Sequence, residues 1–166
     1  VRITKAEGRA YSYDLNSSGR PETFALTQGA GAYTLEVLEH LRENRYEPVH
    51  TISLEVALTD ERAPFLSSSQ FVYYTPDSKT VGLARELAGE LDKDSEKTAV
   101  LFDYVVDHLS YDKEKTEQVA PGYLPDLDQT LAEGKGICFD YAALLCAMLR
   151  SQGVPCKLVM GDAGNL

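Results

Sequence analysis

Residues 134–161 read GKGICFDYAALLCAMLRSQGVPCKLVMG. A glycine-containing turn comes first, then a cysteine at the start of an almost uniformly apolar run, then a glycine and a short apolar segment. We expect a helix over residues 138–152, because Gly153 suits a left-handed C-cap and Pro155 prevents the helix from continuing. A helix that is apolar on nearly all sides is buried. Residues 138–152 are therefore predicted to form the centre of their domain.

Cys138 stands at the N-terminus of this predicted helix. A helix N-terminus carries a partial positive charge and free backbone N–H groups, so it favours a thiolate over a thiol. The same N–H groups can receive the oxyanion that forms when sulfur attacks an acyl carbon. Cys138 is therefore our candidate nucleophile. The alternative is a buried structural cysteine, which is our interpretation of Cys146 in the middle of the helix, while Asp140 is expected to complement the helix dipole.

The composition excludes several classes of function. The chain has 166 residues and a formal net charge of -10 at pH 7, which argues against binding to nucleic acids or to anionic membranes. No apolar run approaches the roughly 20 residues that a membrane span requires. We expect a protein without a membrane span and without a cofactor.

The cysteines do not form a closed disulfide framework, because there are three of them. Cys138 and Cys146 would lie about 12 Å apart along the helix, whereas a disulfide needs Cα atoms within about 7 Å. Cys146 and Cys156 either meet in a disulfide or remain two small buried hydrophobic residues. No two cysteines have the C-x₂₋₄-C spacing of a zinc site, so no metal site is expected.

The first 75 residues have the alternating pattern of β-strands. Apolar residues alternate with polar or small ones in the runs 24–26, 33–37 and 52–58, and one more strand is expected at 71–75. Turn residues separate these runs. Several short strands in series predict an antiparallel β-sandwich-like domain over residues 1–75.

The pattern changes to that of helices after Pro76. Asp77 or Ser78 is expected to cap a first helix and Ser95 a second one, whose apolar face would be Ala99, Phe102, Val106 and Leu109. A long loop over 111–126, a short helix over 128–132 and a strand over 156–160 complete the prediction. The class is therefore α+β, with a second domain over residues 76–166.

The residues around Cys138 resemble the nucleophile segment of the transglutaminase-like superfamily. The matching stretches are GICFDYAAL at 136–144, LRSQGVP at 149–155 and VMGD at 159–162. Tyr111-Asp112 and the PGYLPD stretch at 121–126 resemble bacterial secreted members of that group. The resemblance covers about residues 77–162. It implies a papain-like core with a Cys–His–Asp triad, and an extracellular or cell-surface location with protein, peptide or cell-wall substrates.

Two tyrosines are candidates for lining the acyl site: Tyr141 from the first turn of the helix and Tyr123 from the preceding loop. The alternative is that both are core tyrosines whose hydroxyl groups bind backbone carbonyls.

The sequence departs from the family pattern at the triad histidine. His40, His50 and His108 all precede Cys138, and the chain stops before the position of the family's histidine and aspartate. A free cysteine is only about 3% thiolate at pH 7, and a helix N-terminus raises this to the order of 10%. We expect the chain as it stands to be inactive. We also expect a C-terminal segment or a second copy to cover Tyr141, Leu145 and Met148.

Two hypotheses about function remain open. In the first, the parent protein is a thiol acyltransferase or hydrolase that forms an acyl-enzyme at Cys138. In the second, it is a non-catalytic cell-surface interaction module whose papain-like domain is degenerate. The retained cysteine favours the first.

Overall fold

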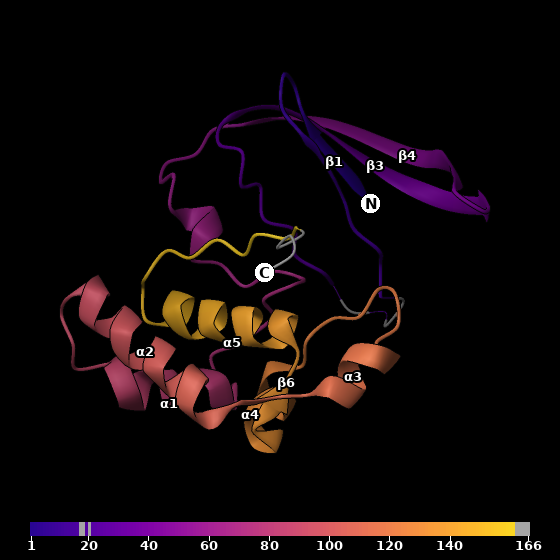
Figure 1. Ribbon diagram of the computed structural model, residues 1–166. Helices are drawn as coiled ribbons and strands as arrows, with labels where there is room; N and C mark the ends of the chain where they lie inside the picture. Colours follow the sequence, from indigo (N-terminus) through magenta and orange to yellow (C-terminus); the bar gives the residue numbers. More distant parts are fainter. Residues whose placement is uncertain (17–18, 20, 162–166) are drawn as a thin grey trace. The chain divides into compact units, whose positions relative to one another are not determined.

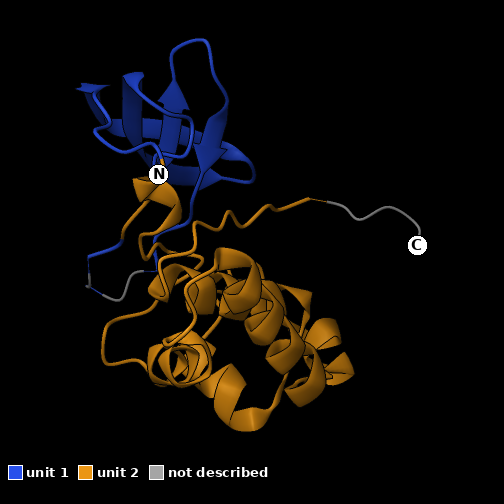
Figure 2. Ribbon diagram, turned by 90° about the vertical axis from the view of Figure 1, so that its left-hand side faces the viewer, with its two compact units in different colours: residues 1–22, 26–61 blue, residues 23–25, 62–166 orange. Residues whose placement is uncertain are grey.

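The computed structural model describes residues 1–16, 19 and 21–161 (Figure 1). It contains both helices and an antiparallel sheet, so the α+β class is confirmed. The chain divides into two compact units, Val1–Glu22 with Leu26–Glu61, and Thr23–Ala25 with Arg62–Leu166 (Figure 2). This division lies near residues 61–62. The boundary at residues 75–76 between independently folding domains stays a prediction.

The first unit is one four-stranded antiparallel sheet. Its strands are β1 (Arg2–Lys5), β2 (Ala10–Ser12), β3 (Gly31–Arg42) and β4 (Arg45–Val56), in the order β2-β1-β3-β4. The alternation at 33–37 and 52–58 predicted that β3 and β4 exist, but both strands are longer than predicted. Leu35 pairs with both Ile3 and Ile52, so one face of the sheet carries apolar side chains from three strands.

Two expected strands and the second layer of the sandwich are not formed. Within the described part of the first unit, the strands make a single sheet. Residues 24–26 and 71–75 carry no strand. Phe24, Ala25 and residues 71–75 belong to the second unit, whereas Leu26 belongs to the first. Val72 is 1% exposed and packs in the helical core, so the alternation at 71–75 reflects packing against helices. The amide of Gln70 donates to the carbonyl of Thr23, which joins these two segments.

The second unit is built from helices around one buried helix. The order is α1 (Lys79–Ala88), α2 (Asp94–His108), α3 (Lys113–Gln118), α4 (Leu127–Glu133) and α5 (Cys138–Ser151), after a short 3₁₀ turn at Ala63–Phe65. Helices α1, α2 and α4 all contact α5 (Figure 1). Gly153 follows α5 with a φ of 80°, the left-handed conformation that the sequence predicts there. Over the part of the chain that the structure describes, every helix is too short or too polar to span a bilayer.

The structure corrects the expected exposed face of α5. Met148 is 0% exposed, and Tyr141 and Leu145 pack, partly buried, against the same core. Helices α1, α2 and α4 contact α5. Cover of Tyr141 and Leu145 by a C-terminal segment or a second copy stays a prediction. The expected strand over 156–160 is also wrong, because no strand is formed there in the part of the chain that the structure describes. Cys156 donates one hydrogen bond to the carbonyl of Phe65, and Val159 and Met160 are 75% and 59% exposed.

Helix α2 buries a different face from the one predicted. Leu101, Val105 and Leu109 are buried, whereas Phe102 and Val106 are exposed. The N-cap is Lys93 and the helix begins at Asp94, so Ser95, the expected cap, lies inside the first turn. Its sequence carries two adjacent apolar stripes, and contact with α5 selects one of them.

The N-terminus of α1 is capped from another helix. The side chain of Ser78 makes no capping bond. Instead, the carboxylate of Asp128 in α4 accepts from the amides of Lys79 at 3.0 Å and Thr80 at 2.9 Å, and from the Thr80 hydroxyl at 2.8 Å. A carboxylate at a helix N-terminus satisfies free N–H groups and complements the dipole. Although burial opposes it, this bonding lowers the pKa of Asp128.

We predict that Asp128→Ala lowers the free energy of unfolding by about 1–3 kcal/mol, because it leaves the buried Thr80 hydroxyl without an acceptor. The pKa of Asp128 is lower in the folded than in the unfolded state. Its contribution to the free energy of unfolding is therefore complete above the ordinary aspartate pKa of about 3.9 and is lost as the pH falls from there through the lower pKa of the folded state. Urea unfolding at pH 7 and pH 3 measures this. Asp103→Ala, at an exposed position of α2, is the control. An equal loss at both positions would contradict the capping role.

Candidate functional site

Cys138 is exposed and is the first residue of α5. The segment before it is anchored by a short parallel pair of strands, β5 (Ser110–Tyr111) and β6 (Lys135–Gly136). The amide of Ser110 donates to the carbonyl of Gly134, and the amide of Asp112 to the carbonyl of Gly136, both at 2.9 Å. These bonds hold the turn that presents the thiol at the start of the helix.

Asp140 is the buried centre of the site. Its side chain is 0% exposed. Oδ2 accepts a hydrogen bond from the amide of Ile137 at 2.8 Å and one from Lys115 Nζ at 2.7 Å, and Oδ1 accepts one from the Tyr123 hydroxyl at 2.5 Å. The bond to Ile137 satisfies one free N–H at the helix start, as in a capping box. Asp140 therefore does more than complement the helix dipole.

Lys115 lies in α3 and completes the cluster around Asp140. Its Nζ stands 4.7 Å from the centre of the Tyr123 ring. Partial burial disfavours the charged amine, but the hydrogen bonds with Asp140 and Tyr123 outweigh it, so the pKa of Lys115 is raised. Burial and the bond to Asp140 likewise raise the pKa of Tyr123. At neutral pH Lys115 is therefore an ammonium and Tyr123 a neutral phenol.

The sequence interpretation missed both Lys115 and α3, which it placed in a long loop. One signal was present: Asp112 precedes a run of good helix formers, and its carboxylate caps α3 by accepting from the amide of Lys115 at 2.9 Å. Nothing in the local sequence indicates that Lys115 reaches a residue 25 positions later.

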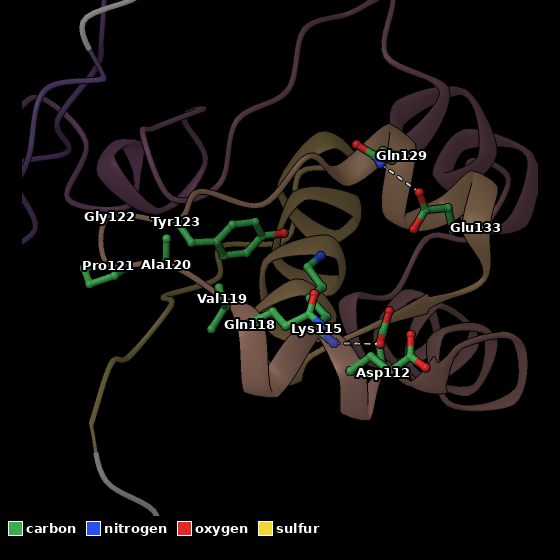
Figure 3. A pocket seen from close by; sticks show the side chains of 11 residues that line it. Asp112, Lys115, Gln118, Val119, Ala120, Pro121, Gly122, Tyr123, Gln129 and Glu133 are labelled. Carbon is green, nitrogen blue, oxygen red and sulfur yellow. Dashed lines mark hydrogen bonds between the residues drawn. The ribbon is translucent and has the colours of Figure 1, made fainter.

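A cavity of about 580 Å³ adjoins this cluster (Figure 3). Lys115 and Tyr123 contribute to its wall from α3 and the following loop, and Gln129 and Glu133 from α4. Figure 3 shows the Tyr123 ring and the Lys115 side chain together in this wall. Cys138 is not among the residues that line the cavity.

The two candidate tyrosines differ in position. Tyr123 lines the cavity, but its hydroxyl is engaged by Asp140. Its ring also meets the Phe139 ring edge-on, with centroids 6.2 Å apart. Tyr141 is partly buried against the hydrophobic core and does not line the cavity. Burial raises the pKa of Tyr141.

No histidine is hydrogen-bonded to Cys138 within the described residues. The ring of His108, at the end of α2, is stacked on Tyr104 with centroids 4.1 Å apart, and its Nδ1 lies 2.9 Å from the Tyr104 carbonyl. His40 bonds the carbonyl of Glu43 in the first unit. His50 lies in β4.

All three cysteines are free thiols. Cys146 is buried, and its sulfur lies 3.4 Å from the carbonyl oxygen of Cys156. The neighbouring Cys156 and burial raise the pKa of Cys146, while the Cys146 thiol lowers the pKa of the half-buried Cys156 to about 7. Among the described residues, no group of three or more His, Cys, Asp or Glu side chains is arranged to hold a metal ion.

Comparisons with known proteins identify one family. The model of the Transglutaminase-like superfamily matches residues 81–165, just over half of the chain. No curated protein matches the chain. A solved structure from Parabacteroides distasonis ATCC 8503, described as a "putative protease", is 18% identical with a TM-score of 0.39. That match covers 76% of this chain, and this chain spans only 30% of the length of that protein.

We predict that Gly136→Ala destabilises the site. A Cβ at Gly136 would lie 2.7 Å from the Cβ and 2.9 Å from Oδ2 of Asp140, so the buried carboxylate would have to move. We expect a loss of about 1–3 kcal/mol in the free energy of unfolding, measured with urea. Gly82→Ala in α1 is the control: a Cβ there meets nothing within 4 Å, and we expect a gain of up to about 1 kcal/mol. Equal stabilities of wild type and Gly136→Ala would contradict the packing described.

We further predict that iodoacetamide at pH 7 labels Cys138 fastest, because its thiol is exposed at a helix start whereas Cys146 is buried with a raised pKa. Peptide mapping of the folded protein after short exposures measures the three rates. Cys156 is the main competitor, and its labelling is expected to rise with a midpoint near pH 7. Faster labelling of Cys146 or Cys156 than of Cys138 would overturn the choice of nucleophile.

Proposed function

The chain belongs to the transglutaminase-like superfamily, and on that premise we propose that it is part of a thiol enzyme whose nucleophile is Cys138. The single observation that carries the proposal is the position of Cys138, exposed as the first residue of α5, on a turn that a buried carboxylate fixes. The first N–H groups of a helix have no acceptor within the helix, so those of this turn can receive an oxyanion.

The proposed reaction is acyl transfer through a thioester. The sulfur of Cys138 attacks the carbonyl carbon of an amide or ester, the C–S bond forms, and the C–N or C–O bond breaks as the leaving group departs. Water or an amine then attacks the thioester and releases the thiol. Hydrolysis and transfer to an amine differ only in this second step.

The reaction of an amide requires a proton for the leaving amine. The resemblance implies that a histidine and an aspartate assist Cys138, and none of the three histidines takes that place among the described residues. The 166-residue chain is therefore expected to accept acyl groups only from activated donors, whose leaving group departs without a proton.

The substrate class follows from the resemblance and from the cavity. We propose protein, peptide or cell-wall donors outside the cell, as for the bacterial secreted members that the chain resembles. The cavity beside Tyr123 is the proposed place for part of the donor, with Tyr123 as its aromatic wall and Tyr141 near the first turn of α5. The wall of this cavity carries the carboxylates of Asp112, Glu114 and Glu133. These negative charges suit donors with neutral or cationic groups better than donors with anionic ones.

One observation favours a second function, that of a surface interaction module. On the sheet face of the first unit, Val37 and Ile52 are 36% and 46% exposed. Exposed apolar side chains on a strand surface are suited to contact with another protein. This function does not require Cys138 to react with acyl donors.

The test is acylation by the p-nitrophenyl ester of a short peptide. We predict an acyl adduct on Cys138, seen by peptide mapping, and a burst of p-nitrophenol that Cys138→Ala abolishes and Cys156→Ala retains. Added primary amine should release the adduct faster than buffer if the enzyme is a transferase. A burst that survives Cys138→Ala, or an adduct spread evenly over the three cysteines, would refute the proposal and favour the interaction module.

A further inference from the structure

We propose that Lys115 is a positioning residue for Cys138. Its ammonium neutralises the buried carboxylate of Asp140 and ties α3 to the first turn of α5, so that this turn keeps the geometry and charge that a thiolate requires. The consequence for catalysis rests on the proposed function. The reactivity of the thiol itself can be measured without any acyl substrate.

The first step of the argument is electrostatic. Asp140 is two residues after Cys138, in the same helical turn, and is 0% exposed. The carboxylate binds the amide of Ile137 at the same helix start and so offsets the positive end of the helix dipole that favours a thiolate, and burial reduces its screening by water. The ammonium of Lys115 stands 2.7 Å from Oδ2 of Asp140. It compensates the negative charge that would otherwise oppose the thiolate.

The second step is geometric. Oδ2 of Asp140 is shared between Lys115 and the amide of Ile137, the residue immediately before Cys138. Without the ammonium, the carboxylate keeps only neutral donors, from Ile137 and Tyr123. A buried charge in that state is costly and rearranges to reach water or a proton. The first turn of α5 would move with it.

The third step is that Lys115 is itself held in place. Its Nζ lies 4.7 Å from the centre of the Tyr123 ring, and that ring packs edge-on against Phe139, the residue immediately after Cys138. Asp112 caps the helix from which Lys115 extends. Lys115 therefore has one arrangement rather than the many rotamers of a surface lysine.

A second pair of charged groups lies close to this turn, with Glu114 and Glu133 near it. Lys135 Nζ in β6 lies 3.1 Å from Asp112 Oδ2. The Lys135 side chain is 48% exposed, so water and salt screen its charge. Tyr123 is a titratable neighbour of both Asp140 and Lys115, and its pKa is raised. Lys135 is the matched control, because it is also a lysine paired with an aspartate and stands three residues before Cys138.

The experiment compares Lys115→Met, Lys115→Arg and Lys135→Met in the full chain. The readout is the rate of iodoacetamide labelling at Cys138 from pH 5.5 to 9.5, with circular dichroism to follow the fold. For Lys115→Met we expect at least about a threefold slower rate at pH 7 and a profile moved at least about half a pH unit upward. Lys115→Arg should stay close to wild type, and Lys135→Met within about 1.5-fold of it.

A folded Lys115→Met protein with the wild-type profile would overturn the inference. So would Lys135→Met with a loss as large as that of Lys115→Met. If Lys115→Met does not fold, the double variant Lys115→Met/Asp140→Asn removes both charges. Recovery of the fold with a profile near wild type supports charge compensation, and failure to fold or an unrestored profile refutes it.

The outcome is separable from the proposed function. A profile that depends on Lys115 in a protein that forms no acyl adduct at Cys138 keeps this inference and removes the enzyme proposal. An acyl adduct at Cys138 that forms equally well with and without Lys115 keeps the enzyme proposal and removes this inference.

Discussion

The buried carboxylate of Asp140 is the constraint on which the site depends. A carboxylate without exposed surface is stable only when it is hydrogen-bonded and paired. Its three donors belong to three segments: the N-cap residue Ile137, Lys115 in α3 and Tyr123 in the loop before α4. Satisfying this one group therefore fixes both the turn that carries Cys138 and one wall of the cavity.

The packing of the other helices of the second unit fixes the position of α5. Helix α5 is surrounded by α1, α2 and α4, and Leu144 and Met148 have no exposed surface. Asp128 links α4 to the N-terminus of α1, and the β5–β6 pair places Gly136 directly against Asp140. The thiol thus stands at the end of the best-packed element, while the segment that supplies Lys115 and Tyr123 lies at the surface.

The sequence predicted the features that depend on local pattern. The position of α5, its glycine stop and the cysteine at its start follow from apolar content and capping. Features that depend on distant partners were not predictable. The apolar stripes of α2 indicate a helix, but only contact with α5 decides that Leu101 rather than Phe102 is buried. The partnership of Lys115 with Asp140 spans 25 positions and has no local signature.

The central claim is that the first turn of α5, held by Asp140, is both the nucleophile and the oxyanion site. The crystal structure of the protein after acylation by an activated ester tests it most directly. We predict a thioester on Cys138 whose carbonyl oxygen lies about 2.7–3.1 Å from backbone N–H groups of that turn, with the three hydrogen bonds of Asp140 intact. A thioester oxygen that points to solvent, away from these N–H groups, would contradict the account.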